Sequence, residues 1–205
     1  MNAEDPGVTT IGVLALQGDF FAHEACLARH GVATVRIRKP EQLTGIDGIV
    51  LPGGESSTML RLLDYAQLFE PLRDRIASGL PTLGTCAGLI LLANEVEDPR
   101  QPSLGLLDVT VSRNAYGAQV HSGLFDIQGC DGLPPSRGIF IRAPRITRIG
   151  NGVEVLATRD GDAVLVRQDA ILGAAFHPEL DAAGHITHEL FLKAVSRRSA
   201  LEHST

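Results

Sequence analysis

The sequence predicts an α/β fold: a mostly parallel central sheet with helices on both faces, a three-layer arrangement that carries an antiparallel extension. In the first half of the chain, short runs of branched aliphatic residues alternate with stretches of helical periodicity. In the second half, after the proline-containing segment 97–102, strand-like runs are separated only by glycine and asparagine turns. Helices between strands indicate right-handed crossovers and parallel pairing, whereas short turns indicate antiparallel pairing.

The elements of the first half follow in a regular order, and Gly31 ends the first helix. The predicted strands are residues 11–16, 32–37, 48–51 and 81–85. The predicted helices are residues 20–30, 56–65, 69–78 and 87–94.

The second half contains five short strand candidates and a closing amphipathic helix at residues 188–197. The strands are residues 106–113, 138–141, 153–159, 163–168 and 171–175. The chain shows no internal repeat or low-complexity tract, so we expect one domain over residues 1–205. Its ordered core should span about residues 10–196, with loose tails.

The composition and charge favour small-molecule chemistry. The 205 residues carry a net charge of −6, which argues against general nucleic-acid binding because phosphates require a basic surface. The longest apolar runs, such as residues 89–93, are far shorter than the roughly 20 residues of a membrane span. The N-terminus has acidic residues and no basic segment of a signal peptide. We therefore expect no membrane association and a cytoplasmic location.

The three cysteines, Cys26, Cys86 and Cys130, neither pair evenly nor show CxxC spacing. The sequence therefore indicates no disulfide framework and no metal site. An isolated cysteine is most often a small buried hydrophobic residue, and packing is the default expectation for Cys26 and Cys130.

Cys86 differs because of its surroundings. Gly84 and Gly88 flank it at two positions on either side, between a predicted strand and a predicted helix. This spacing is typical of a nucleophile elbow, a sharp turn that projects its central residue from the sheet. The following helix N-terminus favours a thiolate. Taken alone, the pattern fits a catalytic cysteine and a turn that buries a cysteine equally well.

His177 and Glu179 follow the predicted strand 171–175 directly. Functional groups of parallel sheets gather at the carboxyl ends of strands, which places His177 on the same edge as Cys86. His177 could then take the thiol proton, and Glu179 could hold the imidazole in the required tautomer. His-Pro-Glu alone is more often a surface turn, so the hypothesis depends on its conjunction with Cys86.

A glycine-rich turn, PGGESS at residues 52–57, lies between a buried strand and a helix. Glycines let backbone N–H groups approach a substrate oxygen closely, as an oxyanion hole requires. A phosphate-binding loop is a competing interpretation, but neither GxxxxGK[ST] nor GxGxxG is present. A second competing interpretation is a simple strand-to-helix turn with Ser56 at the helix N-terminus.

In this order, the three segments resemble the class I, triad-type glutamine amidotransferases. The similarity is greatest to the glutaminase subunits of pyridoxal 5'-phosphate synthase and runs from residue 11 to about residue 193. The segments that carry it are LQG at 16–18 with His23, PGGESS at 52–57, GTCAGLILL at 84–92, LGLLDV at 104–109, RNAYG at 113–117, FIRAP at 140–144 and FHPEL at 176–180.

The resemblance implies hydrolysis of L-glutamine to glutamate and ammonia through a γ-glutamyl thioester on Cys86, without a cofactor. It implies a catalytic triad of Cys86, His177 and Glu179, and an oxyanion hole from the N–H groups of Gly54 and Ala87. An arginine also suits the substrate α-carboxylate, although a surface ion pair is the more usual role. The glutamine-binding residues that it implies are Gly54, Glu55, Ser56, Arg113, Ile141 and Arg142.

The resemblance also implies a partner, the synthase (lyase) subunit, which would receive the ammonia and would order the oxyanion turn on binding. Gln17, Gly18 and His23 are candidates for the partner interface, and a strand end with a helix cap is an equal alternative for them. The chain departs from the family pattern after RNAYG. Ala118, His121 and Gly123 replace an arginine, an aspartate and an aromatic residue, which puts the details of partner docking in doubt.

Three other interpretations compete with this one. The first is a triad amidotransferase that serves another acceptor, against which FIRAP and RNAYG argue. The second is a non-catalytic amidotransferase-like subunit, which loss of the cysteine or histidine would indicate; both are present. The third is a cysteine peptidase or chaperone of similar topology, which would lack the His-Pro-Glu segment.

Overall fold

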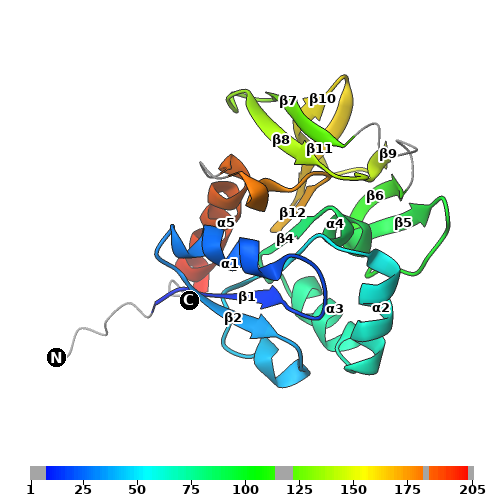
Figure 1. Ribbon diagram of the computed structural model, residues 1–205. Coiled ribbons are helices and arrows are strands. Elements are labelled where there is room, and N and C mark those ends of the chain that lie inside the picture. The colour runs from blue at the N-terminus through cyan, green and yellow to red at the C-terminus, as the bar shows by residue number, and fades with distance from the viewer. Residues whose placement is uncertain (1–7, 114–121, 182–184, 203–205) are drawn as a thin grey trace.

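The computed structural model describes residues 8–113, 122–181 and 185–202. Within these ranges, nine strands form one mixed sheet in the order β2-β1-β3-β4-β12-β11-β10-β7-β8 (Figure 1). The strands of this sheet are β1 (Thr10–Leu14), β2 (Ala33–Ile37), β3 (Gly48–Leu51), β4 (Thr82–Thr85), β7 (Gly123–Gly129), β8 (Ser136–Phe140), β10 (Glu154–Arg159), β11 (Asp162–Gln168) and β12 (Ile171–Ala174).

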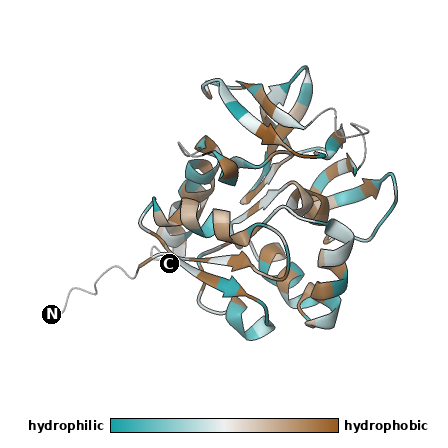
Figure 2. Cartoon of the chain, viewed as in Figure 1, coloured by the Kyte–Doolittle hydropathy of each residue, from teal (hydrophilic) through white to brown (hydrophobic). Residues whose placement is uncertain are grey.

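The sheet is parallel from β2 to β12 and antiparallel from there to β8. The parallel strands β3, β4 and β12 are buried along their whole length, as expected for strands covered on both faces. β3 and β12 are strongly apolar, whereas β4 begins and ends with a buried threonine. Figure 2 shows that α2 and α3 mix hydrophilic and hydrophobic residues, as expected for helices with one face on the sheet and the other in solvent. The predicted α/β fold with its antiparallel extension is confirmed.

Helices cover both faces of the parallel part (Figure 1). On one face, α1 and α5 lie together, since His23 of α1 contacts His188 of α5. On the other face, α2, α3 and α4 pack together and α4 contacts β3, β4 and β12. The helices are α1 (Phe20–Ala28), α2 (Ser56–Tyr65), α3 (Phe69–Ala77), α4 (Ala87–Leu92) and α5 (Ile186–Glu202), with short 3-10 turns η1 (Pro40–Leu43) and η3 (Pro178–Leu180).

A separate three-stranded sheet was not predicted. It consists of β5 (Ala93–Glu97), β6 (Leu107–Ser112) and β9 (Arg145–Ile149) in the order β5-β6-β9. The predicted helix 87–94 ends at Leu92, because the chain turns there into β5 and the carbonyls of Leu91 and Leu92 accept hydrogen bonds from Leu104 and Leu106. The predicted strand 106–113 therefore belongs to this small sheet and not to the extension.

The C-terminal helix is longer than predicted. It continues to Glu202, beyond residue 196, where the ordered core was expected to end. Its buried residues Phe191 and Val195 pack closely over Gly48 of β3, which fixes the helix on the sheet. No helix in the described part of the chain has both the length and the apolar character that a membrane crossing requires.

Candidate active site

The site lies where three neighbouring parallel strands end. Leu51 of β3 pairs with Gly84 of β4, and Thr85 of β4 pairs with Ala174 of β12. The first residue after β4 is Cys86, whose N–H donates to the carbonyl of Ala174. The glycine turn, the cysteine and the histidine follow β3, β4 and β12 and therefore share one edge of the sheet, as the sequence predicted.

Cys86 occupies a strained turn between β4 and α4. Its φ is 48° and its ψ is −102°, a combination that L residues rarely adopt and that is found where function demands it. Gly84 and Gly88 make the turn possible. A Cβ atom on Gly84 would lie 2.7 Å from the carbonyl oxygen of Gly88, and one on Gly88 would lie 2.0 Å from the carbonyl oxygen of Leu51. The geometry is that of a nucleophile elbow.

His177 links Cys86 to Glu179. Its Nδ1 atom lies 2.7 Å from Oε1 of Glu179, and the ring also forms a hydrogen bond with Cys86. Burial alone would lower the pKa of His177, but these hydrogen bonds and the charges of both partners raise it to about 10. At neutral pH the ring is therefore an imidazolium, positioned to stabilise an anionic sulfur.

Glu179 is buried and anionic. Its burial opposes ionisation, yet His23 and the hydrogen-bonded His177 hold the pKa of this carboxyl below its usual range. A buried carboxylate that bonds Nδ1 of an imidazole fixes both the tautomer and the orientation of the ring.

The glycine turn is packed tightly against the histidine. A Cβ on Gly53 would lie 2.4 Å from Cε1 of His177, so only glycine fits there. Gly54 has a φ of +155°, and a Cβ on it would lie 2.5 Å from Oε1 of Gln17. The same Gln17 oxygen accepts a hydrogen bond of 2.9 Å from the N–H of Glu55. The turn thus lies between the bend at residues 17–18 and the imidazole.

A small pocket of about 150 Å³ opens at Cys86. A pocket of this size suits a small metabolite and not a drug-sized ligand. The residues that line it are Gly54, Glu55, Ser56, Cys86, Ile90, Arg113, Ile141 and Arg142. The structure therefore brings all six predicted glutamine-binding residues together with the cysteine.

The pocket contains a pair of opposite charges. A guanidinium nitrogen of Arg113 lies 3.0 Å from Oε1 of Glu55 and 2.9 Å from the hydroxyl of Ser57. Glu55 also caps α2, since its carboxylate accepts hydrogen bonds from the N–H groups of Ser57 and Thr58. Partial desolvation opposes ionisation, but hydrogen bonds from the Thr58 hydroxyl and from the N–H groups of Thr58 and Ser57 lower the pKa of Glu55 to about 2, so the carboxylate is charged at neutral pH.

A thiol on a strained elbow, a buried His-Glu pair and a glycine turn around one small pocket are the parts of a cysteine-dependent amide-hydrolysing site. A model described as the SNO glutamine amidotransferase family matches residues 13–197 of this chain. The chain belongs to the SNO glutamine amidotransferase family.

Individual relatives agree with the family assignment. The pyridoxal 5'-phosphate synthase subunit PdxT of Carboxydothermus hydrogenoformans is 52% identical over 188 residues, which cover 91% of this chain and 98% of that protein. The subunit of the same name from Koribacter versatilis is 54% identical over 187 residues, or 90% and 95% of the two chains. A crystal structure of a glutamine amidotransferase is 44% identical, covers 93% of this chain and 100% of that one, and superposes with a TM-score of 0.84. The predicted amidotransferase class is confirmed.

The candidate interface residues of this amidotransferase lie in two different environments. Gln17 and Gly18 are half-buried and pack against the glycine turn, where a Cβ on Gly18 would lie 1.9 Å from the carbonyl oxygen of Gly53. His23, by contrast, is completely buried, so its side chain does not face a partner. The expectation for His23 is wrong because its ring packs inward against Thr85, Glu179 and His188.

Other functional features were not predicted from the sequence. Ile90 lines the pocket, Thr85 and His188 contact His23, and the Cys26 thiol lies 3.4 Å from the carbonyl oxygen of Glu179. Residues 114–117 of the RNAYG segment, Ala118 and His121 lie outside the described residues, whereas Gly123 is the first residue of β7.

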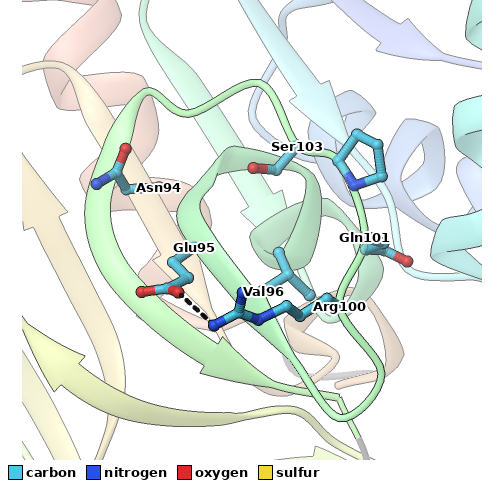
Figure 3. Close-up of a pocket in the computed structure, with 7 residues that line it drawn as sticks. Asn94, Glu95, Val96, Arg100, Gln101 and Ser103 are labelled. Carbon is cyan, nitrogen blue, oxygen red and sulfur yellow. Dashed lines mark ion pairs between the residues drawn. The ribbon is translucent and has the colours of Figure 1, made fainter.

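A second hollow, of about 460 Å³, lies beside the small sheet (Figure 3). It is formed by β5 and the segment after it, where Glu95 and Arg100 form an ion pair of 3.7 Å. Gln101 joins this segment to the active-site turn, because its side-chain oxygen accepts a hydrogen bond from the hydroxyl of Ser56. The described residues that line the hollow include no cysteine or histidine that could form a second Cys-His pair, and its link to the active site is this hydrogen bond from Ser56.

Proposed function

We propose that this chain is the glutaminase subunit of a pyridoxal 5'-phosphate synthase in the cytoplasm. It hydrolyses L-glutamine to L-glutamate and ammonia and passes the ammonia to a synthase (lyase) subunit for vitamin B6 biosynthesis. The observation that carries the proposal is the pocket of about 150 Å³ in which Cys86 meets the six expected glutamine-binding residues. The printed names of the two relatives support the choice of acceptor.

In the proposed acylation step, the Cys86 sulfur attacks the side-chain amide carbon of glutamine. The carbonyl oxygen becomes an oxyanion, which the N–H groups of Gly54 and Ala87 stabilise. His177, held as an imidazolium by Glu179, donates a proton to the amide nitrogen. The C–N bond breaks, ammonia leaves, and a γ-glutamyl thioester remains on Cys86.

In the proposed deacylation step, neutral His177 removes a proton from a water molecule, which attacks the thioester carbon. The C–S bond breaks, glutamate leaves, and the thiolate and imidazolium are restored. Arg113 is the group suited to the α-carboxylate of glutamine, and Glu55 is suited to its α-ammonium. Ile141 and Arg142 also line the pocket.

The partner would act on the glycine turn. Gln17 and Gly18 contact this turn directly and are half-buried, so a synthase that docks at the bend can change the position of the Gly54 N–H. Coupling of this kind would keep the isolated subunit a poor glutaminase.

The test measures glutamate release from L-glutamine by the wild type, Cys86→Ala and the matched control Cys130→Ala, each with and without the cognate synthase subunit. Cys130 is a half-buried free thiol that does not line the pocket. We expect synthase-dependent activity in the wild type and the control and none in Cys86→Ala. Pyridoxal phosphate synthesis by the complex of Cys86→Ala should return when ammonium salt is added.

Two outcomes would contradict the proposal. Glutaminase activity that persists in Cys86→Ala would exclude the nucleophile. Synthase binding without any glutaminase activity in the wild type would indicate a non-catalytic subunit.

A further inference from the structure

A buried imidazole lies behind the catalytic glutamate. His23 of α1 is completely shielded from solvent, and its Nε2 atom lies 3.4 Å from Oε2 of Glu179 and 3.1 Å from the hydroxyl of Thr85. Its Nδ1 atom lies 3.2 Å from Nε2 of His188 on α5. The chain of polar groups that starts at Cys86 therefore continues past Glu179 to a second helix.

Glu179 needs a second partner for its charge. One carboxylate oxygen bonds His177, whereas Oε2 is buried and makes no hydrogen bond of good geometry in the described part of the chain. A buried carboxylate oxygen without a donor is strongly unfavourable. The ring nitrogen of His23, at 3.4 Å, is placed to supply that donor if it carries the proton.

His188 determines where that proton lies. Burial lowers the pKa of His23 and lowers that of His188 to about 3, so both rings are neutral and each has one N–H. Nδ1 of His188 is buried and has no hydrogen-bond partner among the described residues, so a proton there would be unsatisfied. The proton of His188 therefore belongs on Nε2, where it is donated to Nδ1 of His23.

This donation fixes the second ring. Because Nδ1 of His23 accepts a hydrogen bond, its own proton must be on Nε2, between the Thr85 hydroxyl at 3.1 Å and Oε2 of Glu179 at 3.4 Å. The proton is therefore shared between these two oxygens, and its share on Oε2 is the contact that the proposal uses. A neutral donor also has an advantage over a cation, since it satisfies the carboxylate without competing with His177 for its charge.

We propose that His23 and His188 are positioning residues of the glutaminase: His188 fixes the tautomer of His23, and the Nε2–H of His23 holds the second oxygen of Glu179. The catalytic consequence rests on the proposed glutaminase activity, whereas the tautomers can be measured without it.

The first experiment is nuclear magnetic resonance of the full-length chain labelled with ¹⁵N at its seven histidines. Long-range ¹H–¹⁵N correlations distinguish the two neutral tautomers and the cation, and the variants His23→Gln and His188→Gln assign the signals. We expect neutral Nε2–H rings for His23 and His188 at pH 7. An Nδ1–H tautomer or a cation at either position would overturn the proposal, whether or not glutaminase activity is found.

The second experiment compares His23→Leu, His23→Gln, His188→Leu and the matched control His185→Leu. His185 is also buried near the start of α5, but its Nδ1 bonds Thr187 instead of the triad. The readouts are kcat and KM for glutamine in the synthase complex, and the rate at which iodoacetamide alkylates Cys86 in the isolated chain, followed on the Cys86 peptide.

We expect kcat of His23→Leu to fall roughly tenfold to hundredfold with little change in KM, because Glu179 loses the partner of its second oxygen. His23→Gln can place an amide N–H near the same oxygen and should recover part of the loss, and Cys86 alkylation should follow the same order. His188→Leu should lower kcat more than His185→Leu.

The contrary results are equally specific. Unchanged kcat in a folded His23→Leu, no recovery in His23→Gln, or equal losses in His188→Leu and His185→Leu would each show a merely structural role. A wild type without glutaminase activity would refute the proposed function and leave the tautomer measurement to decide the positioning arrangement. If a leucine variant fails to fold, the tautomers of the wild type still decide the question.

Discussion

Nδ1 of His177 lies 2.7 Å from Oε1 of Glu179, and burial of this pair protects it from solvent screening. Glu179→Gln removes the negative charge and should lower the pKa of His177 from its value of about 10. The alkaline limb of the pH dependence of kcat/KM should then move to lower pH, and kcat should fall about tenfold or more. Both effects are measured by initial rates of glutamate release by the synthase complex between roughly pH 6 and pH 10, a range that includes the ordinary and the raised pKa of histidine.

Glu154→Gln is the matched control for this substitution. Glu154 forms an ion pair with Arg167 outside the pocket, so its neutralisation should leave the pH profile unchanged. An identical profile for Glu179→Gln and the wild type would show that the carboxylate does not set the titration of His177.

Arg113→Met should weaken glutamine binding. The guanidinium is largely shielded and lines the pocket, and in the proposed binding mode its loss leaves the α-carboxylate of the substrate without a charged donor. We expect KM to rise about tenfold to hundredfold with a smaller change in kcat, as measured by steady-state kinetics. Arg148→Met, at an ion pair with Asp108 on the small sheet, should leave KM near that of the wild type. A fall in kcat at constant KM would instead assign Arg113 to the chemical step.

Glu55→Gln should reduce the loss of folding stability that acidification causes between pH 4.5 and about pH 2. The pKa of Glu55 is lowered from 4.5 to about 2, so the carboxylate stabilises the fold above pH 4.5, and this contribution is lost as the pH falls through about 2. Because the side chain is half-exposed, the difference at pH 7 should be below about 1 kcal/mol.

Thermal unfolding at several pH values tests this expectation. The melting temperatures of the wild type and Glu55→Gln should differ at pH 7 and converge near pH 2, where the cap carboxylate is half protonated. Asp64→Asn, an exposed substitution on the same helix, controls for the loss of one negative charge. A constant difference at all pH values would exclude an ionised cap.

Gly88→Ala should destabilise the elbow severely. The new methyl group would lie 2.0 Å from the carbonyl oxygen of Leu51, and two backbone segments would have to move apart. We expect a loss of about 3 kcal/mol in the free energy of unfolding, as measured with urea. Gly161→Ala has open space and a φ of +86°, so it should cost only about 1 kcal/mol. Equal losses would contradict the close approach of α4 to β3.

Much of the fold and the catalytic edge follow from local sequence. Strands β3, β4 and β12 are short buried runs, and Gly53, Cys86 and His177 follow soon after them. The carboxyl ends of parallel strands meet by topology. The pocket residues were identified by resemblance, since nothing local indicates that Arg113 and Ile141 would meet. The geometry supports this grouping, and their roles stay proposals until tested.

Other features depend on long-range packing that local patterns do not contain. The sequence ANEVE of β5 follows a buried apolar run without a clear period, so the helix was predicted to continue through Asn94. His23 and His188 are 165 residues apart, and a single histidine on a helix does not reveal which buried group it contacts. The predicted partner-facing role of His23 failed for this reason.

The ion pair between Arg113 and Glu55 has a consequence for selectivity. The two charges compensate each other, and a ligand that binds both groups must replace this ion pair with its own charges. A zwitterion can do so and leave neither protein charge unpaired, because its carboxylate pairs with Arg113 and its ammonium pairs with Glu55. An amide that carries only one of these charges would leave either the Arg113 guanidinium or the Glu55 carboxylate without a partner of opposite charge. If Arg113 and Glu55 bind the substrate as proposed, the pocket discriminates between free amino acids and other small amides before any bond is broken.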